Sequence, residues 1–379
     1  MLSFSNVAPG LRVAVYRSSS IGDVVLATSC LDLLDRLEIP VDVTWLGRSP
    51  SLELVSAAWP SIRPVEVKRP SDGAGKTDVL NSLRDVDFIV DLQTSLRSRA
   101  LCLQARREFG VSSYTCEKNT VDRGRMVLAA RLRGRARTMP PPLPVLQHQL
   151  MTQALLNALT IHLPGCLTEN LLGCVARPRL NTAHDSMQSP WQKELKFGRW
   201  LAIAPGAMYE TKRAPLNLFT GILDELRRGW KLGEGDSGQG VGLVLLGDDR
   251  DRDLATELLD SIHWPFSVLN LAGKLSLWES ALALKEATCL LGNDSALCHI
   301  AEAVGTPVAS LFGPTSESFG FAPWRTSSHA FSASLGCRPC SKHGSTTCRY
   351  GDVLCFQMIG GQDVAQHIKD LFSSDESAE

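Results

Sequence analysis

Short apolar runs alternate along this chain with polar turns and with stretches of helical period. Runs at 11–17, 41–46, 65–68 and 88–92 predict buried strands in the first half, and runs at 200–207, 241–246, 268–271, 289–291 and 307–315 predict them in the second. Amphipathic segments at 24–37, 145–159, 275–287, 296–304 and 362–372 predict helices. This alternation is typical of an α/β fold with doubly wound parallel sheets.

The clearest junction of strand, turn and helix lies at 289–305. Asp294 and Ser295 suit the N-cap of a helix that ends at Gly305. Free N–H groups and the positive end of the helix dipole can bind a phosphate at such a position. His299 lies one turn inside the helix, so it can reach the same ligand. An ordinary capped helix also explains these residues.

A second junction follows the first strand, where Asp23 opens a helix after a loop of small residues. The loop contains a single glycine, Gly22, and no lysine followed by serine or threonine, so it matches neither the dinucleotide fingerprint nor the phosphate-binding P-loop. Asp23 fits two roles, a helix cap or a general base.

Three further loops carry polar groups at the carboxyl ends of predicted strands. The loop at 91–99 places Gln93, Arg97 and Arg99 on the same sheet edge as Asp23. Lys212 and Arg213 follow the strand at 200–207 and could bind phosphate charge. The acidic loop at 247–251 could accept hydrogen bonds from ribose hydroxyls.

The length of 379 residues predicts two domains, placed at 1–180 and 181–360, with a helix at 361–379 that could return to the first domain. Hydrophobic residues make up 44% and charged residues 21%, as in soluble globular proteins. No apolar run approaches the roughly 18 residues of a membrane span, and the first ten residues do not resemble a secretory signal. We therefore expect a cytoplasmic protein.

Basic residues are concentrated in the first half of the chain. Residues 1–180 carry 22 Lys and Arg against 16 Asp and Glu, whereas 181–379 carry 17 against 24. Between Arg97 and Arg137, 11 basic side chains face 3 acidic ones. The segment 123–137 predicts either a solvated face or contact with a polyanion such as phosphorylated lipid or an anionic membrane. Nucleic acid is disfavoured because few aromatic residues interleave with the arginines.

Eleven cysteines occur in the chain, and four of them gather near its end. A reducing compartment disfavours disulfides. Two alternatives remain open for Cys337, Cys340, Cys348 and Cys355, a zinc site or reduced structural thiols. The leading pair has the spacing of zinc ligands, whereas the second pair is too widely spaced.

Several motifs together resemble the lipopolysaccharide heptosyltransferases of glycosyltransferase family nine. These motifs cover nearly the whole chain in the order of that family: Ser19–Asp23, Pro205–Ala207 with Lys212, Arg213 and Pro215, Leu271–Gly273, Asn293–Ser295 with His299, and Phe312–Thr315. The resemblance implies a GT-B fold, with two Rossmann-like domains facing across a cleft, the first for the acceptor and the second for the nucleotide sugar.

The resemblance further implies an inverting, metal-independent transfer of heptose from ADP-L-glycero-D-manno-heptose to the lipopolysaccharide inner core, without a cofactor. Asp23 matches the base, and Lys212 matches the residue that stabilises the leaving diphosphate. Donor contacts are assigned to Gly206, Lys212, Asp251, Asp294, Ser295, Ala296 and His299, and acceptor contacts to Ser20, Gly22, Gln93, Arg97 and Arg99.

The implied partners are ADP-heptose, a phosphorylated glycolipid and an anionic membrane, so we expect a peripheral protein at the inner face of the inner membrane. Two positions depart from the family pattern: Ala296 replaces a common glycine and Ala214 a common tryptophan. Two alternatives remain: a nucleotide-sugar epimerase on the same scaffold, and a catalytically silent protein that binds anionic glycolipid.

Overall fold

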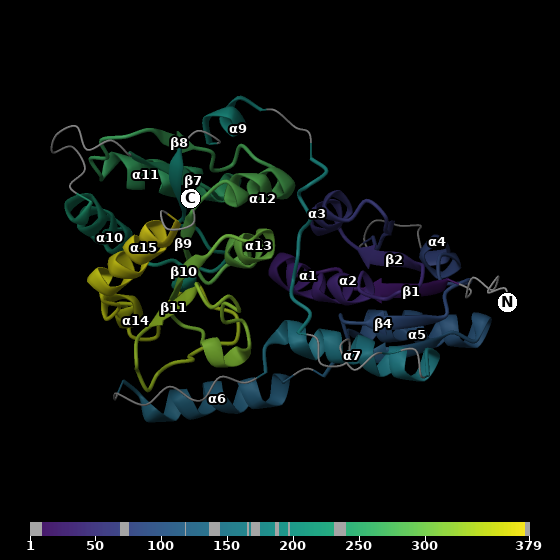
Figure 1. The fold of residues 1–379 in the computed structure, drawn as a ribbon. Helices are drawn as coiled ribbons and strands as arrows, with labels where there is room; N and C mark the ends of the chain where they lie inside the picture. Colours follow the sequence, from purple (N-terminus) through teal and green to yellow (C-terminus); the bar gives the residue numbers. More distant parts are fainter. Residues whose placement is uncertain are drawn as a thin grey trace. The chain divides into compact units, whose positions relative to one another are not determined.

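A computed structural model describes residues 10–68, 76–117, 119–135, 145–164, 167, 175–185, 189–195, 198–230 and 240–375. The chain divides into two compact units (Figure 1). Unit 1 consists of Met1–Lys118 and Gln147–Asn181, and unit 2 of Asn119–Leu146 and Thr182–Glu379. Each unit contains its own parallel sheet.

The sheet of unit 1 has the strand order β3-β2-β1-β4-β5, and every pair is parallel. Its strands are β1 (Leu11–Tyr16), β2 (Val41–Gly47), β3 (Arg63–Glu66), β4 (Phe88–Asp91) and β5 (Ser112–Thr115). Its helices are α1 (Ile21–Ala27), α2 (Ser29–Leu34), α3 (Ser51–Ala58), α4 (Lys76–Asn81), α5 (Leu96–Phe109) and α7 (Gln147–His162). The strand order reverses between β1 and β4, which makes this pair the switch point of the sheet.

The sheet of unit 2 has the order β11-β10-β9-β6-β7-β8 and is also parallel. Its strands are β6 (Arg199–Ala204), β7 (Val241–Leu245), β8 (Val268–Asn270), β9 (Cys289–Asn293), β10 (Val308–Phe312) and β11 (His329–Ser332). Its helices are α6 (Thr120–Arg133), α9 (Pro190–Leu195), α10 (Leu216–Gly229), α11 (Arg252–Asp260), α12 (Leu277–Lys285), α13 (Ala296–Val304), α14 (Leu354–Gln357) and α15 (Gly361–Asp375). Here the switch point lies between β6 and β9.

Two doubly wound parallel sheets confirm the predicted α/β fold class. The apolar runs form the central strands, whose residues are almost all fully buried. Residues 24–37 form two helices in place of one. The hydroxyls of Thr28 and Ser29 donate to the carbonyls of Val25 and Leu26 at 2.7 and 2.8 Å. These bonds compete with the helical ladder where α1 ends and α2 begins.

The division into units differs from the predicted one in two places. Residues 119–135, which contain α6, belong to unit 2. Val127 and Ala130 of α6 are buried, and the guanidinium of Arg123 lies 4.9 Å from the ring centre of Phe321. Helix α15, which was predicted to return to the first domain, belongs to unit 2. Its apolar side chains join α10 in the core of unit 2, where the two helices lie side by side (Figure 1).

One predicted segment falls partly outside the described residues, because the arginine-rich segment 123–137 extends past residue 135, where the described range ends. Within the described ranges, no helix combines the length and the hydropathy required to cross a bilayer.

Candidate functional site

The loops after β6 and β9 meet at the switch point of unit 2, where parallel α/β sheets commonly bind ligands. Asn293, which ends β9 and is fully buried, connects them. Its Oδ1 accepts the N–H of Ala214 at 3.0 Å, and its Nδ2 donates to the carbonyl of Pro205 at 2.7 Å. These bonds fix the loop that carries Gly206 and Lys212 against the start of α13.

The ammonium of Lys212 lies 2.7 Å from Oδ2 of Asp294, and the hydroxyl of Thr315 donates to the same oxygen at 2.6 Å. Burial acts to raise the pKa of Asp294, but Lys212, Thr315 and His299 together hold this pKa below its ordinary value. Asp294 is therefore a carboxylate at neutral pH. Three groups predicted to bind the donor, Lys212, Asp294 and His299, thus form one cluster.

Of the two residues predicted to suit the N-cap of α13, Ser295 lies at that position and Asp294 does not. Ser295 occupies the N-cap position, but its side chain makes no cap hydrogen bond, and Asp294 bonds to Lys212 and Thr315 instead. Within the described ranges, the buried Ser295 Oγ has no hydrogen-bond partner. Ala296 follows as the first helical residue. An unsatisfied hydroxyl at a helix N-terminus is suited to donate to an anionic ligand.

Gly206 and Asp251 lie in direct contact. A Cβ atom on Gly206 would lie 2.1 Å from Oδ1 of Asp251, so the position requires glycine. Asp251 is 9% exposed and accepts the N–H of Asp248 at 3.0 Å. Burial raises its pKa above the ordinary value. The structure thus places the predicted ribose-binding carboxylate beside the predicted diphosphate-binding loop.

A buried carboxylate organises the aromatic side of the cluster. Glu302 of α13 is 1% exposed and accepts the N–H of Trp324 at 3.1 Å and the N–H of Arg325 at 3.0 Å. The indole of Trp324 lies parallel to the ring of His299, with an interplanar angle of 10° and centroids 6.1 Å apart. Burial raises the pKa of Glu302 to about 7, against the opposing effect of these N–H groups.

The switch point of unit 1 holds the predicted base. Asp23 lies in the first turn of α1, and its Oδ2 accepts from the Ser20 hydroxyl at 2.8 Å and contacts Nη2 of Arg17 at 2.8 Å. Arg17 is 6% exposed and also donates to the carbonyl of Leu92 at 2.5 Å. The capping interpretation of Asp23 is confirmed, because Ser20 and Asp23 form a capping box. Gly22 lies between them, half-buried in α1.

Gln93 joins the loops after β1 and β4. Its Oε1 accepts the N–H groups of Ser18 and Ser19 at 3.0 and 3.3 Å. The fully buried Asp91 accepts the N–H groups of Gln93 and Thr94 at 3.0 and 2.9 Å. Thr94 adopts a positive φ of 43°, which costs energy in a residue other than glycine and marks a tightly constrained turn.

The two predicted acceptor arginines occupy different environments. Arg97 donates to the carbonyl of Lys68, beyond the end of β3. Arg99, two residues further along the first turn of α5, is exposed. The structure therefore gathers Ser20, Gly22 and Gln93 with Asp23, ties Arg97 to the neighbouring loop and leaves Arg99 in solvent.

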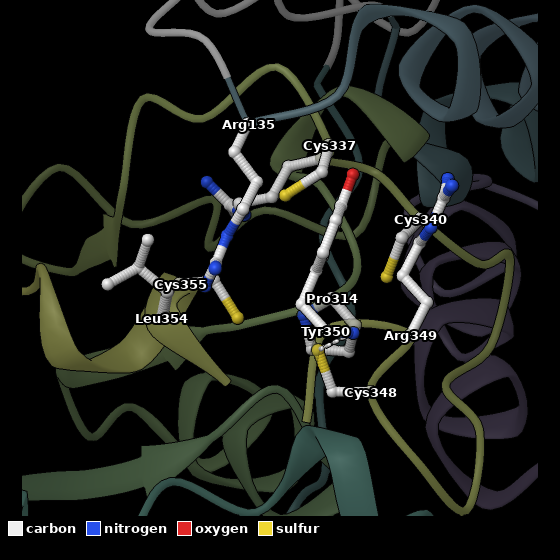
Figure 2. A pocket seen from close by; sticks show the side chains of 10 residues that line it. Arg135, Pro314, Cys337, Cys340, Cys348, Arg349, Tyr350, Leu354 and Cys355 are labelled. Atoms are coloured by element: carbon white, nitrogen blue, oxygen red, sulfur yellow. Dashed lines mark hydrogen bonds between the residues drawn. The ribbon is translucent and has the colours of Figure 1, made fainter. Parts of the chain in front are cut away.

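Cys337, Cys340, Cys348 and Cys355 line one small cavity of unit 2, together with Arg135, Arg338 and Tyr350 (Figure 2). Burial raises the pKa of Cys355 to about 12 and also raises the pKa values of Cys337 and Cys340. Among the described residues, no group of three or more His, Cys, Asp or Glu side chains could hold a metal ion. The prediction of reduced thiols or zinc stays untested.

Sequence reasoning missed the partners that orient these groups. Arg17 could have been recognised because it is a charged residue at the end of a predicted buried strand. Thr315 could have been recognised because it is the last residue of the family motif Phe312–Thr315. Glu302 gave no signal, because a glutamate on an amphipathic helix is usually exposed.

Comparison with known proteins identifies the family. Residues 77–350 match the model of glycosyltransferase family 9 (heptosyltransferase). An 83-residue segment is 35% identical to lipooligosaccharide heptosyltransferase 2 of Haemophilus influenzae and spans 21% of this chain and 24% of that protein. Curated relatives are thus matched over about a quarter of their length.

Solved structures extend the similarity of fold to nearly the whole chain. E. coli ADP-heptose lipopolysaccharide heptosyltransferase II matches with a TM-score of 0.65 and 18% identity, covering 97% of this chain and 100% of the other. E. coli heptosyltransferase WaaC with ADP matches with a TM-score of 0.59 and 15% identity, covering 95% and 100%. Because the family model covers well over half of its residues, this chain belongs to glycosyltransferase family 9, the heptosyltransferase family.

Proposed function

We propose that this protein is an inverting, metal-independent glycosyltransferase that transfers heptose from ADP-L-glycero-D-manno-heptose to the inner core of lipopolysaccharide. Family membership and the names of the relatives support the donor and the acceptor. The observation that carries the proposal is the cluster at the switch point of unit 2. There a lysine, a histidine and an unsatisfied serine hydroxyl surround the N-terminus of α13.

The donor diphosphate would bind at this N-terminus. Ser295 Oγ and the first backbone N–H groups of α13, from Ala296 onward, donate to phosphate oxygens, and Lys212 supplies a positive charge. His299 lies one turn inside the helix, held between Trp324 and Asp294. Asp251, beside Gly206, accepts from the ribose hydroxyls.

Lys212 is already paired with Asp294, so a bound diphosphate has to share its charge. A lysine that is already paired with a carboxylate binds a diphosphate less strongly than an unpaired lysine does. In return, the pair holds the ammonium in a fixed position, so that little side-chain entropy is lost on binding. As the bond to the sugar breaks, negative charge grows on the diphosphate. The fixed N–H, hydroxyl and ammonium groups therefore stabilise the leaving diphosphate more than they stabilise the intact nucleotide sugar.

Asp23 would accept the proton of the attacking hydroxyl. The acceptor oxygen forms a bond to the anomeric carbon, the bond from that carbon to the diphosphate breaks, and the proton moves to Asp23. Arg17 and Ser20 hold the carboxylate in one orientation. Gln93, Gly22 and Ser20 contact the acceptor sugar, and Arg97 and Arg99 its phosphate groups. The acceptor is a glycolipid, so we also propose a cytoplasmic location with peripheral contact to the inner membrane.

Substitution Asp23→Asn tests the base directly. We expect transfer from ADP-heptose to fall by at least about a hundredfold while ADP affinity stays unchanged. Asp87→Asn is the matched control, because Asp87 pairs with Arg12 at the start of β4 and should be dispensable for transfer. Unchanged turnover in Asp23→Asn would remove Asp23 from this role. Conversion of the donor without acceptor would instead favour a nucleotide-sugar epimerase.

A further inference from the structure

Helix α6 presents two opposite faces. At 100° per residue, Arg123, Val127 and Ala130 fall on one side. Val127 and Ala130 are buried, and the guanidinium of Arg123 lies over the rings of Phe319 and Phe321. Further contacts fix both ends of the helix: Lys342 donates to the carbonyl of Thr120, Arg349 to that of Arg131, and Arg133 to that of Gly336. The inner face of α6 is thus anchored to unit 2.

The outer face carries a stripe formed by Val121, Arg125, Leu128 and Leu132, which fall within an arc of about 60°. Val121 is 66% exposed, Leu128 60% and Leu132 81%. Arg131 and Arg133 flank the stripe and are also exposed. Three large apolar side chains in one row, bordered by cations, form an exposed amphipathic surface of a kind that usually marks an interaction site.

We propose that this stripe of α6 is a membrane-docking surface that binds the face of an anionic lipid bilayer. An interfacial helix inserts leucine and valine side chains at the boundary between headgroups and acyl chains, while arginines beside them contact lipid phosphates. The exposed arginines in or beside the stripe are Arg125, Arg131 and Arg133, and Asp122 is the single acidic residue of 119–135, so the charge complements an anionic surface. The anchored inner face holds the stripe in position before it binds.

Other partners fit this surface less well. Single-stranded nucleic acid would require aromatic side chains for base stacking, and α6 contains none. A second copy of the chain would bring the arginines of two helices into contact without compensating carboxylates. A bilayer satisfies both the apolar row and the cations. The inference rests on the proposed function in one respect, since a glycolipid acceptor gives the enzyme a reason to act at a membrane.

The test is co-sedimentation of the full-length protein with phosphatidylethanolamine vesicles, with and without phosphatidylglycerol. We expect binding only to the anionic vesicles, weakened by high salt. Leu128→Gln/Leu132→Gln should reduce this binding by about tenfold or more, and Arg125→Glu by about fivefold or more. Glutamine keeps the helix propensity of leucine, and both changes leave the buried face intact.

The matched controls are Ile161→Gln on α7 and Arg228→Glu on α10, both exposed and far from α6 in sequence. They should bind vesicles like the unchanged protein. If the α6 variants sediment like the unchanged protein, if that protein ignores anionic vesicles, or if it binds neutral vesicles equally well, the inference is wrong. Transfer to a soluble acceptor fragment should survive in the α6 variants. If the unchanged protein itself shows no transfer to this fragment, the proposed function is contradicted, whereas the membrane-docking inference is not.

Discussion

Glu302 is a buried carboxylate whose ionisation should make unit 2 less stable as the pH rises. Burial raises its pKa from 4.5 to about 7. Between these two values, the folded chain keeps a proton that the unfolded chain has released. The contribution of Glu302 is therefore fully present below about pH 4.5 and is lost as the pH rises through about 7. The higher pKa of Glu302 in the folded chain corresponds to about 3 kcal/mol of unfolding free energy.

The substitution Glu302→Gln isolates this contribution. The amide has nearly the same shape and can still accept one of the N–H groups of Trp324 and Arg325. Any remaining difference between the amide and the protonated carboxyl changes the stability of the variant by an amount that does not depend on pH. The difference in unfolding free energy between variant and unchanged protein should therefore move by about 2.5 kcal/mol in favour of the variant between pH 5 and pH 8.

Urea unfolding at a series of pH values measures this difference, with tryptophan fluorescence as the probe because Trp324 lies beside the site. Glu257→Gln, which removes an exposed carboxylate on α11, is the control and should show no comparable change with pH. A constant difference between Glu302→Gln and the unchanged protein from pH 5 to pH 8 would refute the reasoning. It would mean that the carboxylate is ionised throughout that range.

Two further substitutions test the loops of unit 2. Asn293→Ala leaves the N–H of Ala214 and the carbonyl of Pro205 without their partner. We therefore expect a loss of about 2–5 kcal/mol in unfolding free energy, measured by urea unfolding, and weaker ADP binding, measured by calorimetric titration. Gly206→Ala places a methyl group against the carboxylate of Asp251, so we expect a loss of about 1–3 kcal/mol in unfolding free energy and reduced ADP affinity. Unchanged stability and ADP affinity in either variant would contradict the contacts of Asn293 and Gly206.

The central strands could be predicted because they are continuous apolar runs. The edge strands β5 and β11 were missed because they are four residues long and partly exposed, and so have no continuous apolar pattern. The loops at the carboxyl ends of the strands could also be predicted, because in a parallel sheet the loops that follow the strands all lie at the same edge. The sequence therefore indicated which residues share an edge, but not which of them touch.

The pairings depend on tertiary contacts that have no local sequence signal. Lys212 and Asp294 are far apart in the chain, as are Ser18 and Gln93, and only the strand order brings their loops together. Helix α6 shows the same limit at the level of domains. Its arginines predicted an anionic partner, but the attachment of its inner face to unit 2 follows from contacts with residues about 200 positions later.

The central claim is that the cluster around Lys212 and Asp294 binds the diphosphate of the donor. The variant Lys212→Met/Asp294→Asn removes both charges, because removing the lysine alone would leave a buried carboxylate without its partner. Isothermal titration of ADP measures the consequence. Loss of a charge-assisted contact should weaken binding by about tenfold or more. An ADP affinity equal to that of the unchanged protein would contradict the claim.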